Sequence, residues 1–333
     1  MKSALATPLS VLLVFAATAA AGPVDDPFGY FNLYSLGDVG SASAPYQGEI
    51  IGVAGAAGNV YFSSALHGHN SSTGYALHAG GSAALTGTYL GSLDVGGNVR
   101  LGGAGVAGSL VAGGDVTSSA GGAIGGDVIA AGAISLPESV IVNGTTQSGV
   151  AYTPRVNHEA LSDYFAEAAM NIGLREDTGQ WTEDGGHIRF QGQAGVNVIT
   201  VDAATLKGAW AVTIEAPEGA VVYVNVPDGA VELDGTAWRY EGGLDAADVV
   251  LNLPFAMSLD LSSTNAVNVL APFATTYFDC GLLAGTLVVG DLQGGGQINP
   301  SSFEQGDSIP EPGAMAVLAL GGVTMLARAR RRS

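Results

Sequence analysis

The chain has 333 residues, of which 11 are Lys or Arg and 30 are Asp or Glu, so its formal net charge is −19. This acidic balance excludes a general nucleic-acid binder, because phosphate contacts need a basic face. Charged residues make up only 12% of the chain and hydrophobic residues 47%, whereas disordered acidic segments combine many charges with few apolar groups. The 51 glycines follow no strict Gly-X-Y period, which excludes collagen.

The N-terminal segment, residues 1–21, has the pattern of a secretory signal peptide. Lys2 supplies the positive start, and an apolar stretch follows at residues 11–15. The small residues Ala19 and Ala21 offer a cleavage site. The apolar run is short for the roughly 20 residues that a membrane-spanning helix needs. We therefore predict that the protein is exported and that residues 1–21 are removed.

Residues 308–333 form a second predicted sorting signal. An apolar stretch, residues 313–327, lies between a Pro-Glu-Pro motif and an arginine cluster that would stay on the cytoplasmic side of a membrane. The motif residues are Pro310, Glu311, Pro312, Arg328, Arg330, Arg331 and Arg332. This arrangement resembles the PEP-CTERM tail of Gram-negative bacteria that make exopolysaccharide. The resemblance implies that an exosortase-type membrane protease recognises and removes the tail after a transient anchoring. The alternative is a permanent short anchor.

The body between these signals, residues 22–307, is strongly acidic. It holds 6 basic and 29 acidic residues, a net charge of −23. Such a surface suits an extracellular protein that repels its copies. Cys280 is the one cysteine of the chain, so no internal disulfide framework is possible. We expect Cys280 to be a small buried side chain, with an intermolecular disulfide as the alternative.

A loose Gly-Asx-Val repeat runs through the first half of the body. Its copies begin at Gly58, Gly97, Gly114 and Gly126, and the related glycines at positions 81, 97, 114 and 132 follow one another at nearly constant steps. Gly and Asx supply turns because they tolerate a positive φ. Short strands with regular turns are typical of a sandwich, a barrel or a stacked solenoid. The near-constant step favours the solenoid, in which small Ala and Gly side chains fill a narrow core.

One segment, about residues 157–173, has the period of a helix instead. Its apolar residues recur at steps of 4, 3 and 4: Leu161, Phe165, Ala168 and Ile172. Asn157 is a suitable N-cap and Gly173 can end the helix. Strands are expected again at 196–201, 210–214, 221–226, 249–253, 258–261, 267–270 and 282–289. We predict a mainly β protein, a discontinuous parallel β-solenoid with this amphipathic helix docked on its flank.

Three stretches of the body together resemble the choice-of-anchor A family of exported bacterial proteins. The first has Phe31-Asn32 and Gly37-Asp38 before a glycine-rich coil, the second spans residues 201–220, and the third has Asn252-Leu253-Pro254 and residues 269–274. Leu253 stands where the family usually has Phe, and Asp279-Cys280-Gly281 departs from its polar turn. The resemblance covers residues 28–303 and implies one β-domain over 22–307 with an exchangeable anchor. The order of coils, helix and coils is also similar to that of ice-binding proteins with a discontinuous solenoid.

The sequence contains no recognisable catalytic set. The GxGxxG match at residues 103–108 lacks the strand before and the helix after that a dinucleotide site needs, so we interpret it as a solenoid turn. No G-x-S-x-G motif is present. Glu183 with Asp184, and Asp245 with Asp248, are carboxylate pairs that arise by chance in so acidic a body. We predict a non-enzyme without catalytic or cofactor-binding residues.

Metal and sugar sites are equally weak in the sequence. His67, His69 and His78 lack the further ligands of a metal site, so we expect an exposed loop, and we expect His158 to face solvent. The aspartates after glycine, Asp38, Asp115 and Asp127, are interpreted as turn formers, with calcium binding as the weaker alternative. Three scattered tryptophans, Trp181, Trp210 and Trp238, give no support to a carbohydrate platform.

Taken together, these patterns predict an exported, non-enzymatic protein of the cell surface or extracellular matrix of a Gram-negative-type bacterium. Its role is expected to be structural or adhesive, within exopolysaccharide or biofilm material. The expected partners are the exosortase-type protease and extracellular polysaccharide or other matrix proteins, and no nucleic acid. The alternatives are a polysaccharide- or ice-binding module on the same solenoid and, less favoured, a polysaccharide-active enzyme. Threonine rows of the kind that an ice-binding face wants are sparse in the coils.

Overall fold

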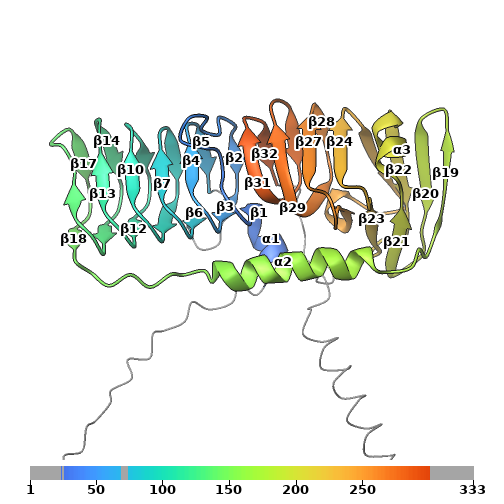
Figure 1. Cartoon of the computed structure of the whole chain (residues 1–333), viewed down its shortest axis with the longest axis horizontal. Coiled ribbons are helices and arrows are strands. Elements are labelled where there is room, and N and C mark those ends of the chain that lie inside the picture. The colour runs from blue at the N-terminus through green and yellow to red at the C-terminus, as the bar shows by residue number, and fades with distance from the viewer. Residues whose placement is uncertain (1–23, 25, 69–73, 301–333) are drawn as a thin grey trace, which may run out of the picture.

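The computed structural model describes residues 24, 26–68 and 74–300. The predicted signal peptide and sorting tail lie outside these residues. The described part forms one row of stacked β-coils with a long helix along its flank (Figure 1). Within it every strand pair is parallel except the hairpin of β19 (Gln180–Asp184) and β20 (His187–Gln191). The predicted mainly β solenoid with a flanking helix is therefore confirmed.

The largest sheet faces the helix and runs the whole length of the row. Its strands, in spatial order, are β18 (Thr146–Ser148), β15 (Val128–Ala130), β12 (Leu110–Ala112), β9 (Ser92–Val95), β6 (Tyr75–Ala79), β3 (Val53–Ala56), β1 (Phe31–Ser35), β31 (Leu287–Gly294), β29 (Asn268–Phe278), β26 (Val249–Asn252), β23 (Val221–Asn225) and β21 (Val196–Thr200). Two more strands, β27 (Ser258–Ser262) and β24 (Ala230–Asp234), join it beside the second half of β29.

Three smaller sheets close the other sides of the coils. A five-stranded sheet consists of β16 (Ile134–Ser135), β13 (Val116–Ser118), β10 (Val99–Leu101), β7 (Ala83–Leu85) and β4 (Val60–Phe62). A nine-stranded sheet consists of β17 (Val140–Val142), β14 (Gly122–Ile124), β11 (Gly105–Val106), β8 (Thr88–Leu90), β5 (Ala65–His67), β2 (Ile50–Ile51), β32 (Gln297–Asn299), β30 (Leu282–Ala284) and β28 (Thr264–Asn265). A four-stranded sheet at one end of the row consists of β19, β20, β22 (Ala211–Glu215) and β25 (Ala237–Glu241).

The first described strand, β1, lies in the middle of the row, and the chain fills the row in two directions from there. The first arm, residues 31–148, winds outward to β18, and residues 149–157 with helix α2 (His158–Gly173) then cross to the opposite end. The second arm, residues 180–299, winds back to the middle (Figure 1). The arms meet where β1 pairs with β31 and β2 with β32, which places Leu33 beside Leu287 and Ile50 beside Ile298. The two coil regions are thus one continuous stack.

The core of the first arm changes in composition from the seam toward the tip. In the coils nearer the seam it holds the rings of Tyr46, Phe62 and Tyr89, all almost fully buried. Toward the tip the buried side chains are aliphatic, such as Ile124 and Ala130. Aliphatic and small side chains fill the core of these coils, in keeping with the alanine-rich sequence.

Helix α2 covers the middle of the largest sheet. The predicted stripe of Leu161, Phe165, Ala168 and Ile172 is buried against outward-facing residues of the sheet, including Val198, Tyr223 and Leu270. The Asn157 side chain accepts a hydrogen bond from the Ala160 N–H at 3.2 Å, which confirms the predicted N-cap. The helix ends at Gly173, as predicted, and Leu174 is its C-cap residue.

Three further short helices occur at corners of the row, within the described residues: α1 (Pro27–Tyr30), α3 (Ala203–Gly208) and the 3-10 turn η1 (Ala246–Asp248). The predicted strand at 282–289 is two strands, β30 and β31. Gly285 lies at the corner between them, where the backbone passes from one sheet to the other, so no single strand can span this stretch.

Candidate functional site

The Gly-Asx-Val turns of the first arm form a ladder of side chains along one corner. In each coil the Asp, Asn or Ser after the glycine accepts a hydrogen bond from the backbone N–H at the same position of the next coil. The successive acceptor oxygens belong to Asp38, Asn59, Ser82, Asn98 and Asp115, and the distances are 2.6, 3.0, 3.1, 2.8 and 2.7 Å. A second ladder runs through Ser92, Ser109 and Asp127 to the Thr145 N–H. These bonds satisfy backbone donors that a corner would otherwise leave unpaired.

The ladder also explains the glycine of the repeat, as Gly114 illustrates. A Cβ atom at Gly114 would lie 2.2 Å from Asn98 Oδ1, the ladder oxygen of the preceding coil. Gly132 stands in the same relation to Asp115 Oδ1, at 2.1 Å. The turn therefore needs glycine because the acceptor of one coil occupies the space that a side chain of the next would take.

The recurring aspartates serve this ladder. Asp38 and Asp115 each receive a backbone N–H from the next coil, and the Asp127 carboxylate receives both the backbone N–H and the hydroxyl of Thr145. These two bonds lower the pKa of Asp127. Among the described residues, no three or more His, Cys, Asp or Glu side chains gather as a metal site would require. The interpretation of these aspartates as turn formers agrees with their observed contacts.

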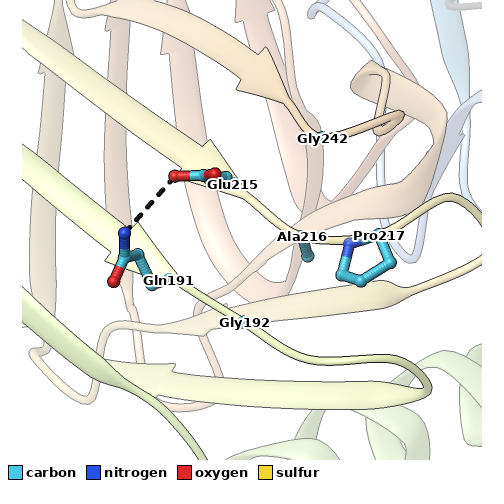
Figure 2. Close-up of a pocket in the computed structure, with 6 residues that line it drawn as sticks. All are labelled: Gln191, Gly192, Glu215, Ala216, Pro217 and Gly242. Carbon is cyan, nitrogen blue, oxygen red and sulfur yellow. Dashed lines mark hydrogen bonds between the residues drawn. The ribbon is translucent and has the colours of Figure 1, made fainter.

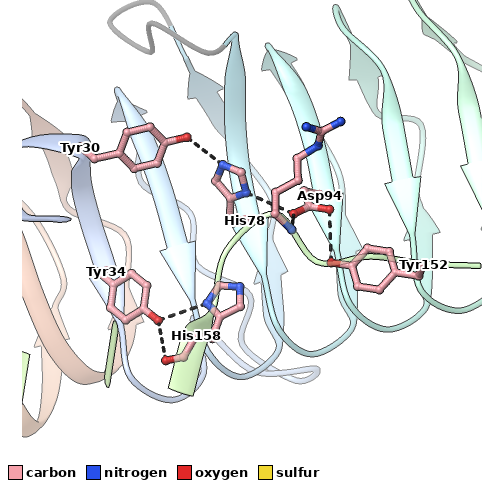
Figure 3. Close-up of polar contacts among 7 residues, drawn as sticks. Tyr30, Tyr34, His78, Asp94, Tyr152 and His158 are labelled. Atoms are coloured by element: carbon pink, nitrogen blue, oxygen red, sulfur yellow. Dashed lines mark hydrogen bonds and ion pairs between the residues drawn. The ribbon is translucent and has the colours of Figure 1, made fainter. Parts of the chain in front are cut away.

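A buried polar cluster ties the crossing segment to the first arm (Figure 3). Tyr30 Oη lies 2.9 Å from His78 Nε2, and His78 Nδ1 lies 3.3 Å from Asp94 Oδ2. Tyr152 Oη donates to Asp94 Oδ1 at 3.2 Å, and the Arg155 N–H donates to Asp94 Oδ2 at 3.2 Å. His78 and Asp94 are only 2% and 1% exposed, so no large ligand reaches them in this conformation. The cluster fastens residues 152–155 to β6 and β9.

His158 belongs to the same region and contradicts the expectation that it faces solvent. Its Nδ1 lies 3.1 Å from Tyr34 Oη, and its ring stacks on the Tyr34 ring at 6.0 Å (Figure 3). Burial, followed by the nearby charge of His78, lowers the pKa of His158 to about 4. The helix docks on the sheet through this residue, because the sheet covers the first turn of α2 as well as its apolar stripe.

The histidines expected in an exposed loop also differ from that prediction. His78 lies inside β6 and is buried, because Asp94 of the next coil neutralises the cost of burying its polar ring. His67 is in β5, with its Nε2 2.7 Å from Glu49 Oε1. His69 lies outside the described residues.

Other residues singled out in the sequence have local contacts. Glu183 accepts the N–H of Gly186 in the β19–β20 turn, and Asp245 and Asp248 cap η1 reciprocally. Residues 103–108 form a coil corner and β11 and lead into another strand, as expected. Cys280 is exposed, so its predicted burial is wrong. It follows the strand β29 at a corner, where side chains point away from the core.

The outward rows of the coils mix different side chains. Across the five-stranded sheet the row reads Tyr61, Ala84, Arg100, Thr117 and Ser135. Across the first-arm half of the nine-stranded sheet it reads Ala65, Thr88, Gly105, Ala123 and Ile141. Neither row repeats threonine from coil to coil.

The four-stranded sheet at the end of the second arm has a different outer face. Strand register places Arg189, Thr213 and Arg239 side by side in one row. The ring of Trp210 stands next to this row, 53% exposed, with its Nε1–H donated to the Gly185 carbonyl at 3.0 Å. The Arg239 guanidinium carbon lies 5.5 Å from the Trp210 ring centroid. No sequence pattern indicates this grouping, because its members come from three different coils.

His187 completes this face. Its Nε2 lies 2.9 Å from Thr213 Oγ1, and its ring is 4.9 Å from that of Trp210. Desolvation, together with the positive charges of Arg189 and Arg239, lowers the pKa of His187. This direction favours the neutral ring, whose Nε2 lies within hydrogen-bond distance of the Thr213 hydroxyl.

A shallow groove of about 370 Å³ adjoins the same face (Figure 2). The lining residues are Gln191, Gly192, Glu215, Ala216, Pro217 and Gly242. Gln191 Nε2 donates to Glu215 Oε2 at 3.4 Å, which joins the neighbouring strands β20 and β22 at the groove. The groove thus offers amide and carboxylate groups, which bind hydroxyls, beside a row that offers guanidinium groups.

A comparison with protein families identifies the domain. Residues 24–300, most of the chain, match the model of the family described as "Putative Ice-binding-like adhesive domain". The chain belongs to this family. It has no match among curated proteins or solved structures. Membership of an adhesive family supports a non-enzymatic protein of the cell surface or extracellular space, as the sequence predicted in outline.

The adhesive domain accounts for the solenoid and leaves the sorting signals as predictions. Ala19, Ala21, the Pro310-Glu311-Pro312 motif and the arginine cluster lie outside the described residues. Within residues 24, 26–68 and 74–300, no helix combines the length and hydropathy of a membrane span. The choice-of-anchor A and PEP-CTERM resemblances rest on the sequence motifs alone.

Proposed function

We propose that this chain is an exported, non-enzymatic adhesin that attaches bacterial cells to extracellular polysaccharide in the surrounding matrix. The observation that carries the proposal is the match of residues 24–300 to an adhesive family. The continuous stack suits the role, because a row of coils with ladders at its corners holds its outer faces in fixed positions.

The proposed address of the adhesin is the envelope of a Gram-negative-type bacterium. The PEP-CTERM-like tail is read by an exosortase-type protease, which releases the domain to the surface or the matrix. The body carries 29 acidic and 6 basic residues, and this charge keeps copies apart in solution. Biofilm or exopolysaccharide material is the proposed destination.

Adhesion is a better-supported role than ice binding. An ice-binding face wants an ordered row of similar side chains, and the outward rows of the first arm change residue type at every coil. The second arm instead exposes large aromatic side chains, including Trp210, Phe255 and Tyr277, and aromatic residues are enriched at binding sites.

The adhesive role is tested by measuring detachment forces. Beads coated with the mature protein are pressed on exopolysaccharide-coated and bare surfaces, and bovine serum albumin beads serve as the control. We expect specific detachment events on the polysaccharide surface. Equal forces on both surfaces would contradict the role, and inhibition of ice recrystallisation by the same protein would favour the ice-binding alternative.

The sorting proposal has its own test, which is mass spectrometry of the native protein from cells and medium. We expect loss of residues 1–21 and of everything after about Pro312. A variant with alanine at Pro310, Glu311 and Pro312 should keep its tail and stay in the membrane fraction. An intact tail on the wild-type protein would make the apolar segment a plain anchor.

A further inference from the structure

The outer face of β20, β22 and β25 gathers rare positive charge. Only six basic residues occur in the body, and two of them, Arg189 and Arg239, share one row. Two strand spacings separate them, about 10 Å. Within the described part of the chain, neither guanidinium has a carboxylate oxygen within 4 Å, whereas Lys207 is paired with Glu232 at 2.5 Å. Arg239 packs over the Trp210 ring, but neither arginine has a carboxylate partner, so both positive charges can bind an external anion.

A fixed aromatic surface lies beside the two arginines. The Trp210 ring is tied to Gly185 by its Nε1–H and flanked by His187 and Arg239, and more than half of the side chain is exposed. A tryptophan held in place loses little conformational entropy on binding. Its flat apolar ring suits the C–H face of a sugar.

We propose that this face binds a polysaccharide of uronic acids, with carboxylates on Arg189 and Arg239 and a sugar ring on Trp210. The planar guanidinium matches a carboxylate with two parallel hydrogen bonds. The separation of the arginines is near the length of a disaccharide, so every second residue of an extended chain can reach one. The inference rests on the proposed adhesive role and names the ligand class for it.

The acidic groups around the row determine how the ligand lies. Glu215 and Glu241 occupy the next row of the same face, and Asp184 lies beside His187. These carboxylates repel the anionic edge of the ligand and accept its hydroxyls, so the ligand carboxylates point to the arginine row. Glu215 and Gln191 extend this hydroxyl-binding edge into the groove of Figure 2. A single contact of this kind is weak, and a polymer gains affinity by engaging many copies of the protein.

The test measures binding of the full mature protein to immobilised polygalacturonate and to its fully methyl-esterified form, which has the same backbone without charge. We expect binding to the acid and at least tenfold weaker binding to the ester. Arg189→Gln and Arg239→Gln should each weaken binding to the acid about tenfold, as expected for loss of a charged hydrogen-bonding group. Arg100→Gln, an exposed arginine of the five-stranded sheet, is the matched control and should bind like wild type.

Trp210 is tested with two variants. Trp210→Ala should weaken binding about tenfold and Trp210→Phe much less, because Phe keeps a flat ring. Circular dichroism of each variant reports whether it is folded. If the Ala variant is unfolded, the Phe variant still tests the contribution of the aromatic ring.

The inference would be overturned by no binding of the wild type to polygalacturonate, by equal binding to acid and ester, or by wild-type binding of both arginine variants. Binding to dextran sulfate as strong as binding to polygalacturonate would also overturn it, because the face would then bind any polyanion and not uronic acids specifically. In each case, specific detachment forces on native exopolysaccharide would still support the adhesive role. If those forces were absent as well, both the adhesive role and the uronic-acid site would be contradicted.

Discussion

The two arms share one stack but differ in how their coils are made. Toward the tip of the first arm the coils are short, with Ala83, Val99, Val116 and Ile134 aligned on successive strands at steps of 16 to 18 residues. At the outer end of the second arm Val196 aligns with Val221 and Val222 with Val249, so these outer coils are roughly half as long again, whereas Val269 and Leu287 near the seam align at a step of 18 residues. The extra residues lie at corners, where they form α3, η1 and the pairs β24–β27 and β22–β25.

This difference suggests that the two arms have different roles: the first arm stabilises the stack and the second arm presents the residues that bind a ligand. Six of the nine exposed large apolar side chains of the described residues lie in the second arm: Val196, Trp210, Phe255, Met257, Phe273 and Tyr277. The first arm has one, Ile141. In the short repeated coils the few corner residues form the ladder. The longer coils have additional corner residues that can contact a ligand.

Replacing Asp94 with alanine should weaken the first arm most. The change leaves the buried His78 ring, the Tyr152 hydroxyl and the Arg155 N–H without their acceptor. Leaving a buried donor without its acceptor typically costs about 1–3 kcal/mol in the free energy of unfolding, and three donors lose their acceptor here. Urea denaturation measures the loss. Hydrogen exchange should show lost protection in the first arm and in residues 149–157.

Glu167→Ala is the control for this change, since Glu167 lies on α2, away from the buried cluster. It should alter the free energy of unfolding by less than about 0.5 kcal/mol. If Asp94→Ala accelerates exchange equally in both arms, the stack unfolds as one unit and the arms are not energetically distinct.

His158 should make the joint between helix and seam sensitive to acid. Its pKa is about 4 in the folded protein and about 6.5 in an unfolded chain. Between these values the unfolded state binds the extra proton, so the free energy of unfolding falls as the pH falls from 6.5 to 4. The loss attributable to this residue reaches about 3 kcal/mol.

The measurement compares wild type with His158→Asn, which keeps a hydrogen-bonding group near Tyr34. As the pH falls below 6.5, the wild-type protein should lose stability relative to the variant. Above pH 6.5 the difference between their free energies of unfolding should stay constant. An NMR titration of His158 with a midpoint near 6.5 would contradict the argument directly.

Gly114→Ala should destabilise the ladder corner by about 2 kcal/mol, the usual cost of forcing an atom into filled space. The new Cβ would meet Asn98 Oδ1 at 2.2 Å. Gly105→Ala is the matched control in the same arm, because no atom lies within 4 Å of its Cβ position. Equal stability of the two variants in thermal unfolding would show that the coils part easily, against the picture of a rigid first arm.

Much of the first arm was predictable, because its features are local. The turn positions follow from Gly and Asx, and the helix follows from Leu161, Phe165 and Asn157. The ladder itself was not predictable, because its bonds join residues such as Asp38 and Asn59 whose alignment depends on the coil length. The burial of His78 and His158 depends on which coil supplies Asp94 and Tyr34, and periodicity along the chain does not contain that information.

The candidate site of the second arm could not be predicted from the sequence either, because its residues meet only through the alignment of successive coils. Arg189, Trp210 and Arg239 stand far apart in the sequence, at unequal steps that match no regular repeat. Only the parallel pairing of β20, β22 and β25 brings them to one face. The exposure of Cys280 likewise depends on the corner that follows β29.

The smallest expected effect tests how the ladder and its glycines depend on each other. Asn98→Ala removes one acceptor and should cost about 1 kcal/mol, the net value of a hydrogen bond. Asn98→Asp should cost less at neutral pH, because aspartate is the ladder residue at positions 38 and 115. Thermal unfolding of both variants measures the difference.

A double-mutant cycle then separates the collision from the lost bond. In the Asn98→Ala background, Gly114→Ala no longer meets Oδ1 but still meets the Asn98 backbone nitrogen position at 2.9 Å. The two changes together should therefore cost less than the sum of the single changes, by about 0.5–1 kcal/mol as neighbouring residues usually do. Strict additivity would mean that the glycine is required by the backbone approach alone. In that case the glycine of the repeat would be required by the close approach of the backbone and the Asx residue by its hydrogen bond, independently of each other. The ladder as described here requires both residues for one reason, which is the position of the acceptor oxygen.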